Sequence, residues 1–276
     1  MASAEGVRAV SVPPRVAATA DHTKMFLGTM EGFRYQYSMH EVFRDWTELA
    51  AAEVHQLPYH AKVCARDADF ERVEAEYLAV AKKYGKDDFE RFGDLLGITR
   101  MALATEHQDF LGQCYMRLEI SNERAGQFFT PYDVSLLIAR MQLDDAEQMI
   151  VDNGGWFTLL EPACGSGGMV IAAAQVLQEK NIHAETAMYF EATDIDRLCA
   201  NMTYIQCGLL GLMGVVWHGN TLSMEMRGHR FTPAARLYPG RTNQMMASTR
   251  AGWLPETRRK IDVTQPLVQA MLLEVA

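Results

Sequence analysis

Hydrophobic residues recur at helical spacing through the first part of the chain. Intervals of three and four residues separate the apolar side chains in each of four stretches, as on one face of an amphipathic helix. We interpret these faces as core-facing, and they predict a helical domain over 21–125 behind a flexible arm over 1–20. The stripes are Val42, Phe43, Trp46, Leu49 and Ala50; Phe70, Val73, Tyr77 and Ala81; Phe89, Phe92 and Leu96; and Phe110, Leu111, Cys114, Tyr115 and Leu118, the last in a helix over 108–120.

The pattern changes after a polar, glycine-containing segment at 121–127. Beyond it, three short apolar runs alternate with two helical stretches. This alternation is typical of a parallel sheet with right-handed crossovers, so the predicted fold class is α/β with a Rossmann-like sheet. The predicted strands are 156–160, 187–193 and 214–218, and the predicted helices between them are 169–179 and 196–210.

The residues after Leu222 look different again. We find no convincing strand in them, only an arginine-rich loop and one apolar helix near 267–275, so the second half of the sheet is expected to be absent or replaced. Over 224–276 there are eight Arg or Lys residues and four Asp or Glu residues. We interpret this segment as a basic C-terminal extension that contacts phosphates or, alternatively, as a solvated tail.

Composition restricts the class of protein further. The 276 residues carry a net charge of −9, the wrong sign for a protein that grips DNA with its whole surface. The five cysteines are scattered with no CxxC pair, which favours reduced cysteines and does not indicate a zinc ribbon or a disulfide framework. No apolar run is long enough for a membrane span, and 1–20 lacks the apolar core of a secretory signal. We therefore expect a cytoplasmic protein without a metal or a membrane partner.

The strongest motif is a glycine-rich turn between the first predicted strand and the following helix. Glycine lets the backbone turn sharply and approach a ligand closely, and a helix N-terminus offers unpaired N–H groups. Such turns also occur without ligands, so the glycines alone are a weak signal. The motif reads Glu161-Pro162-Ala163-Cys164-Gly165-Ser166-Gly167-Gly168.

Polar residues also end the next two predicted strands. Asp194 and Asp196 follow the second, where an acidic side chain can accept both hydroxyls of a ribose. Either could instead cap the next helix, and their positions favour Asp194 as the ligand and Asp196 as the cap. The third strand ends at His218-Gly219-Asn220-Thr221-Leu222, where a polar side chain could pair with the edge of an adenine ring.

Two phenylalanines precede a helix start upstream of the sheet. Thr130 is a suitable N-cap and Pro131 suits the first helical position. A simple helix start is therefore one interpretation of this segment. Because Phe128 and Phe129 are less expected at a solvated turn, packing against a ligand is the other.

Together these residues resemble the S-adenosylmethionine (SAM) motifs of the adenine-N6 DNA methyltransferases, most closely the modification subunit of type I restriction systems. The four motifs occur in the same order, and the resemblance covers about 109–222. They are Phe128-Phe129-Thr130-Pro131; Glu161-Pro162-Ala163-Cys164-Gly165-Ser166-Gly167; Asp194; and Gly219-Asn220-Thr221-Leu222, preceded by a similar helix at Asp109-Phe110-Leu111-Gly112-Gln113-Cys114-Tyr115.

The resemblance implies a methyltransferase sheet over 126–223, SAM as cofactor and DNA as partner. Asp194 would bind the ribose, and Asn220 would offer its carbonyl oxygen where the family has Asp. Glu161 stands in place of the commoner Asp and keeps the carboxylate. The aromatic-Thr-Pro segment would hold the methionine end of SAM. The predicted cofactor-binding residues are Phe128, Phe129, Thr130, Pro131, Glu161, Pro162, Ala163, Cys164, Gly165, Ser166, Gly167, Asp194 and Asn220.

One motif of the family is missing. A methyltransferase of this kind holds the flipped adenine with Asn or Asp, then Pro-Pro, then an aromatic residue. None of the nine prolines follows Asn or Asp, and the only Pro-Pro pair is Pro13-Pro14. We therefore predict no catalytic residue. Three hypotheses remain: a methyltransferase completed by a partner subunit or a second copy; a SAM-binding pseudo-methyltransferase with a regulatory or interaction role; and a dinucleotide-binding protein, which the loop sequence favours least.

Overall fold

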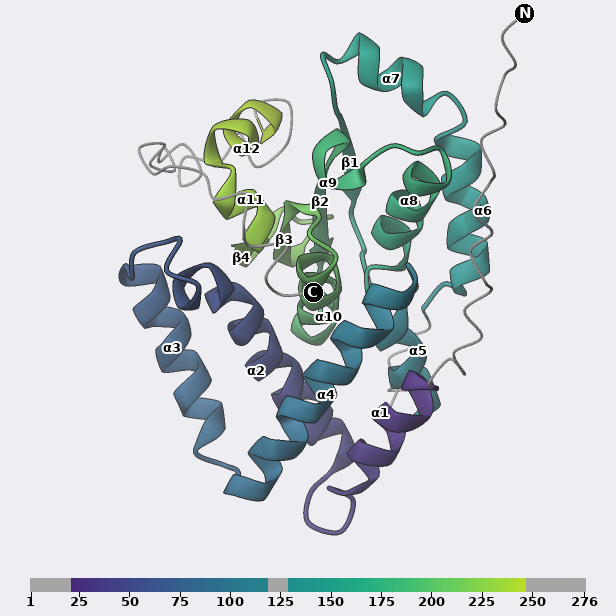
Figure 1. Ribbon diagram of the computed structural model, residues 1–276. Coiled ribbons are helices and arrows are strands. Elements are labelled where there is room, and N and C mark those ends of the chain that lie inside the picture. Colours follow the sequence, from purple (N-terminus) through teal and green to yellow (C-terminus); the bar gives the residue numbers. More distant parts are fainter. Residues whose placement is uncertain (1–20, 119–128, 247–276) are drawn as a thin grey trace, which may run out of the picture.

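The computed structural model describes residues 21–118 and 129–246 (Figure 1). The arm over 1–20, the polar segment at 121–127, Phe128 and the helix near 267–275 lie outside these residues. The elements are α1 His22–Glu31, α2 Met39–His60, α3 Ala68–Ala81, α4 Lys86–Thr105, α5 Phe110–Arg117, α6 Tyr132–Gln142, α7 Ala146–Asp152, β1 Phe157–Glu161, α8 Gly168–Glu179, α9 Ala184–Ala187, β2 Met188–Asp194, α10 Arg197–Leu209, β3 Met213–Asn220, β4 Glu225–Phe231, α11 Pro233–Leu237 and α12 Pro239–Met246.

Five helices, α1 to α5, form the N-terminal region, and the four predicted apolar stripes lie in α2, α3, α4 and α5. The stripe of α2 is buried, with Val42 and Phe43 fully covered and Trp46 only 1% exposed. Aspartate side chains cap the N-termini of α3 and α5. Asp67 accepts a hydrogen bond from Phe70 N, and Asp109 accepts one from Gly112 N. Such caps satisfy amide groups that a helix start leaves unpaired, so sequence fixes these boundaries locally.

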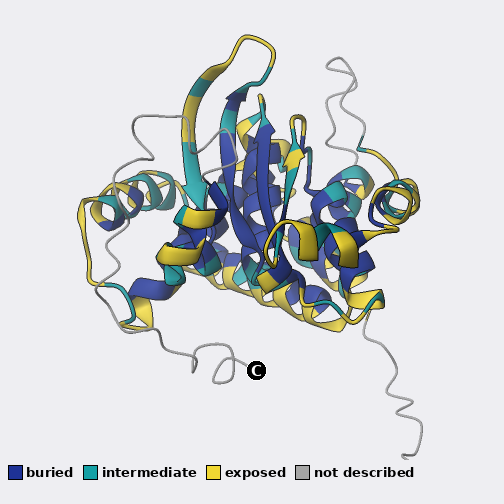
Figure 2. Ribbon diagram, turned by 90° about the horizontal axis from the view of Figure 1, so that it is seen from above, coloured by how far each residue is buried: buried dark blue, intermediate teal, exposed yellow. Residues whose placement is uncertain are grey.

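A four-stranded sheet in the order β1-β2-β3-β4 lies beside the helical region (Figure 1). β1 pairs with β2 and β2 with β3 in parallel, which confirms the predicted α/β class. β2 is buried almost throughout because it has a strand on each side, and Figure 2 shows the central strands as the most buried part of the molecule. The carboxyl ends of the three parallel strands therefore meet at one edge of the sheet.

Helices cover both faces of this sheet. On one face α8 and α10, the two crossover helices, join a large hydrophobic cluster that runs from Phe26 in α1 to Val216 in β3. On the other face a smaller cluster includes Tyr189, Trp217 and Met245. The larger cluster crosses the predicted domain boundary near residue 125, and the predicted division into domains stays a prediction.

The expectation that no strand follows Leu222 is wrong. β4 pairs antiparallel with β3, with Trp217 opposite His229 and Val215 opposite Phe231. Its sequence, Glu-Met-Arg-Gly-His-Arg-Phe, has no apolar run because most of the strand is only half-buried at the edge of the sheet. Pairing with the buried β3 thus creates a strand that its own hydropathy does not indicate. In the described residues, no helix combines the length and apolarity that crossing a membrane requires.

Candidate functional site

Hydrogen bonds join the loops that follow β1, β2 and β3. Cys164 N donates to Thr193 O at 2.9 Å, and Gly165 N donates to Asp194 Oδ2 at 2.8 Å. On the other side, Thr221 Oγ1 donates to Pro162 O at 2.7 Å. The three motifs that the sequence places at separate strand ends therefore form one connected surface at the carboxyl edge of the sheet.

Asp194 stands in the middle of this surface. Its Oδ2 accepts from Gly165 N, and its Oδ1 accepts from Asp196 N at 2.9 Å. Burial raises the pKa of Asp194 above its ordinary value, and these two backbone donors act in the opposite direction. The Ile195 amide is a third backbone donor to this side chain, so the carboxylate, which has about four lone-pair sites, keeps about one for a ligand hydroxyl. Asp196 caps α10 by accepting from Leu198 N at 2.9 Å, which confirms its predicted role as the helix cap.

Glu161 ends β1 next to Asp194. Its side chain accepts a hydrogen bond from Ala163 N at 3.1 Å. Burial raises the pKa of Glu161, and the neighbouring negative charge of Asp194 raises it further. Two carboxylates thus influence one another at the same loop junction. Such a pair is suited to hydroxyl or amine donors rather than to an anion.

The structure corrects the expected use of Asn220. Its Oδ1 already accepts two hydrogen bonds, from Leu222 N at 2.9 Å and from Ser223 N at 3.2 Å. These bonds assign the oxygen to the turn that follows β3, so the carbonyl is not the group that faces a ligand. The Nδ2 amide is the group left for one, and it can only donate.

The glycine-rich turn has the backbone that its sequence predicts. Gly165 has φ +53° and Gly167 has φ +99°, both in the left-handed region where a side chain is unfavourable. A Cβ on Gly165 would lie 3.0 Å from the ring of Phe129, which also contacts Tyr115 at 5.6 Å between ring centroids. The half-buried Phe129 ring therefore packs directly on the glycine turn. This places one of the two predicted aromatic residues at the loop.

Two predicted site residues turn their side chains inward. Ser166 is 2% exposed, and its Oγ donates to the Asp109 carboxylate. The buried Cys164 Sγ accepts from Thr203 Oγ1 at 3.3 Å, and burial raises the pKa of this thiol. Only the backbone of these residues can meet a ligand. Their side chains fix the turn from behind.

The residues that anchor the turn were not predicted. Asp109 Oδ1 accepts from Gln206 Nε2 and from Gly112 N, each at 3.0 Å. Gln206 also donates to Ser166 O at 2.7 Å and accepts from Leu111 N at 3.0 Å. These contacts tie α5 and α10 to the glycine turn. The available signal was Asp109 itself, a typical N-cap residue directly before the apolar stripe of α5.

Asp109 should give the stability of the protein a distinct pH dependence. Burial raises the pKa of Asp109 although three hydrogen bonds oppose the shift. Because the folded protein then binds this proton more tightly than the unfolded chain, stability falls as pH rises from the ordinary aspartate value toward the raised one. Urea unfolding between pH 4 and 8 should show the wild type losing free energy of unfolding relative to Asp109→Asn. If the difference in free energy of unfolding between the two proteins did not change with pH, this assignment would be contradicted.

The remaining predicted residues lie at the surface. Pro162, Ala163, Thr130 and Pro131 are exposed. α6 begins at Tyr132 with Pro131 as its N-cap, and no side chain caps it. The expected Thr130 cap with Pro131 at the first helical position is thus displaced by one residue, because the chain remains extended through the proline (ψ 135°).

A cavity of about 1010 Å³ adjoins this surface. Arg197 and His218, from the ends of α10 and β3, line it, whereas Glu161, Asp194 and Asn220 do not. Hydrogen bonds connect the loops of the three strands, but the three side chains do not line this cavity. A nucleoside-sized cleft that they share stays a prediction.

Comparison with known proteins finds a similarity over part of the chain. Residues 107–232 match the family model described as N-6 DNA Methylase. A solved structure of a protein assigned to the class I S-adenosylmethionine-dependent methyltransferases, from Listeria monocytogenes, matches with 13% identity and a TM-score of 0.41. That alignment covers 88% of this chain and 78% of the other, and it is too weak to bear on fold or chemistry. No curated protein matches the sequence. The matched segment is a little under half of the chain and contains β1 to β4 and every loop of the candidate site, so this part of the chain is similar to the N-6 DNA methylases.

Proposed function

We propose that this chain binds SAM at the loops that close β1, β2 and β3. The observation that carries the proposal is the contact between Asp194 and Gly165 N, which joins the predicted ribose acid to the glycine turn. The resemblance to modification subunits of type I restriction systems supports DNA as the partner of the bound complex, with adenine N6 as the methyl acceptor.

The residues present fit such a cofactor. Asp194 accepts a hydrogen bond from a ribose hydroxyl through its remaining lone pair. Asn220 donates from its Nδ2 to a ring nitrogen of adenine, and the backbone of Gly165 and Gly167 lies against the ligand. By resemblance, the segment ending in Phe129, Thr130 and Pro131 holds the methionine end. When bound, SAM supplies an electrophilic methyl group.

The same residues do not hold a target base. β4 lies on the outer side of β3 and carries neither proline nor a side-chain amide. The Asn or Asp followed by Pro-Pro and an aromatic residue is missing from the sequence. A second copy of this chain would lack the same motif, so we propose that a partner subunit of different sequence completes the base site. The second candidate function, a SAM-binding regulator without methyl transfer, is favoured by this same missing motif.

Calorimetry tests the cofactor. Titration with SAM or S-adenosylhomocysteine should give a dissociation constant near 1 μM or below, about −8 kcal/mol. NAD serves as the control, because a dinucleotide-binding protein would prefer it. The proposal fails if SAM and S-adenosylhomocysteine both bind no better than NAD.

A transfer assay separates the two candidate functions. With tritiated SAM and unmethylated DNA, the purified chain alone should incorporate no label. Label that appears only after addition of a partner subunit supports the completed methyltransferase. Incorporation by the chain alone would show that a base site exists here without the missing motif.

Replacing Asp194 with Ala should weaken SAM binding by about 5- to 150-fold. The physical reason is the loss of a partly buried acceptor, which typically costs about 1–3 kcal/mol. Asp94→Ala is the matched control, because Asp94 is an exposed aspartate on α4. Urea unfolding of both variants checks that the fold persists. Equal SAM affinities in the two variants would mean that Asp194 does not contact the ribose.

A further inference from the structure

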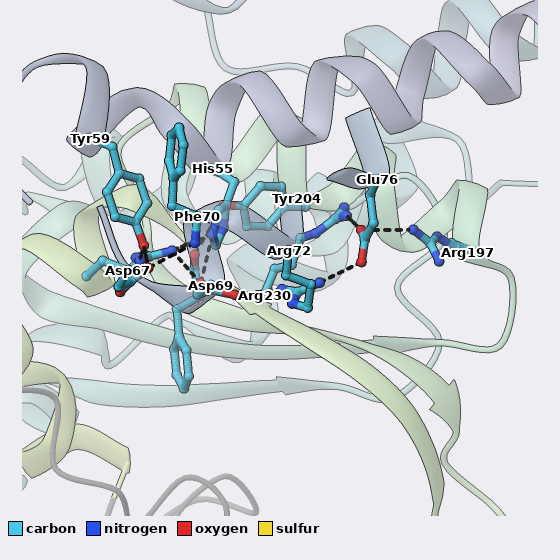
Figure 3. Close-up of polar contacts among 12 residues, drawn as sticks. His55, Tyr59, Asp67, Asp69, Phe70, Arg72, Glu76, Arg197, Tyr204 and Arg230 are labelled. Carbon is cyan, nitrogen blue, oxygen red and sulfur yellow. Dashed lines mark hydrogen bonds and ion pairs between the residues drawn. The ribbon is translucent and has the colours of Figure 1, made fainter. Parts of the chain in front are cut away.

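The cavity of about 1010 Å³ lies between the helical region and the sheet. Residues of α2, α3, α10, α11, β3 and β4 line it, and Figure 3 shows the polar groups gathered there. Pockets that hold drug-sized ligands measure roughly 300–1,000 Å³, so a nucleotide-sized molecule fits. The carboxylates of the proposed SAM site are not part of this lining, so the cavity is a separate feature.

Arginines dominate the lining. Five of them line the cavity, against three carboxylates, in a chain whose net charge is −9. A guanidinium presents a planar fork of donors that matches phosphate oxygens. The arginines are Arg72, Arg197, Arg227, Arg230 and Arg236, and the carboxylates are Asp67, Asp69 and Glu76.

Glu76 is shared among three of these arginines. It binds Arg72 at 2.7 Å, Arg230 at 3.0 Å and Arg197 at 3.5 Å (Figure 3). Each guanidinium has five N–H donors, so one shared carboxylate leaves many of them available. Arg72 also pairs with Asp69 at 2.7 Å, and Arg197 also pairs with Glu48, so the five lining arginines face four carboxylates and the cluster retains one excess positive charge.

A second group of contacts fixes the cavity wall. Arg236 hydrogen-bonds His55, Tyr59 and Asp69, the last at 2.9 Å. Tyr204 Oη contacts His55 Nδ1 at 3.3 Å, which links α10 to α2. A wall held in this way presents its donors in a fixed arrangement, which lowers the ordering cost of binding an anion.

Two lining residues have donors that the fold does not use. Asn201 is 4% exposed; its Oδ1 accepts from Arg230 at 3.0 Å, but its Nδ2 has no hydrogen-bond partner among the described residues. Arg227 on β4 is exposed and forms no ion pair within 21–118 or 129–246. A network that served only to hold α3 against the sheet would not require either donor. Both suit a ligand rich in acceptors.

We propose that this cavity binds a phosphate ester of nucleotide size through Arg72, Arg227, Arg230 and Asn201. The shared chemistry is an anionic phosphate group joined to a nucleoside, which is part of a phosphoanhydride chain in a free nucleotide such as ATP and of a phosphodiester in a single-stranded polynucleotide. Neither source requires SAM at the neighbouring loops, so this proposal is independent of the proposed function.

Binding measurements with three probes test the site: pyrophosphate, ATP and a fluorescent 12-nucleotide DNA single strand. We expect at least one to bind with a dissociation constant below about 1 mM and to weaken as salt rises. If ATP displaces the DNA strand, the cavity accepts a free nucleotide. If the DNA strand binds and neither ATP nor pyrophosphate does, the cavity requires a polynucleotide. The absence of binding by all three probes overturns the proposal.

Variants assign the binding to the cavity. The double variant Arg72→Gln/Arg227→Gln should lower the affinity for the probe at least 10-fold. The single variant Arg100→Gln, an exposed arginine on α4 away from the lining, and the double variant Arg100→Gln/Arg117→Gln should change it less than 3-fold. Both altered residues in the cavity are largely exposed, so urea midpoints should remain close to wild type. Equal affinities in the cavity and control double variants place any binding elsewhere and overturn the proposal.

Discussion

Replacing Gln206 with Leu should destabilise the protein by about 3–5 kcal/mol. Gln206 is fully buried and forms three hydrogen bonds, with Asp109, Ser166 O and Leu111 N. Leucine has a similar volume but no polar atom, so it leaves a buried carboxylate with one donor fewer and two backbone groups unpaired. Because natural domains have a free energy of unfolding of only about 5–15 kcal/mol, the expected loss is a large share of the stability.

Urea unfolding measures the change, with Gln142→Leu as the matched control. Gln142 ends α6 at the surface, so the same substitution there should stay within about 0.5 kcal/mol. A loss in Gln206→Leu no larger than in the control would mean that the contacts around Asp109 contribute little to the fold. Such a result would also remove the proposed support of the glycine turn.

The parallel half of the sheet is predictable from sequence because local patterns and tertiary packing agree there. β2 and β3 are mostly apolar and mostly buried, and α8 and α10 show the apolar faces that cover one side of them. The glycine turn is predictable for the same reason. Its positive φ angles demand the residue type that the sequence shows.

β4 and the anchors of the turn escape prediction because their properties arise from distant neighbours. β4 becomes a strand through pairing with β3, and its own residues are polar. Gln206 lies 97 residues from Asp109 along the chain, so nothing local shows that the two meet. The role of the Asn220 amide likewise depends on a turn conformation, because two backbone donors at the end of β3 occupy its oxygen.

Helix α10 connects the features described above. Asp196 caps it beside Asp194, and Arg197 in its first turn lines the arginine-rich cavity. About two helical turns further, Thr203 donates to Gly165 O at 2.9 Å, and Tyr204 contacts His55. α10 therefore contacts both the glycine turn and the wall of the arginine-rich cavity.

Replacing Gly165 with Val should lower the stability of the protein by about 2–4 kcal/mol and weaken SAM binding by about 30-fold or more. A left-handed backbone costs a residue with a Cβ about 1–2 kcal/mol, and the new side chain meets the Phe129 ring 3.0 Å from its Cβ. The turn must then move, which displaces the Gly165 amide from Asp194. Calorimetry with SAM and urea unfolding measure the two effects.

Gly154→Val is the matched control, because Gly154 also has a positive φ, +76°, but its nearest neighbour, Trp156, is 3.9 Å from the added Cβ. It shares the backbone strain without the crowding and lies outside the three loops of the candidate site. We expect Gly154→Val to keep the wild-type affinity for SAM while losing some stability. If the two variants bind SAM equally well, then the glycine turn does not face the cofactor, and SAM binding must be sought elsewhere on the protein.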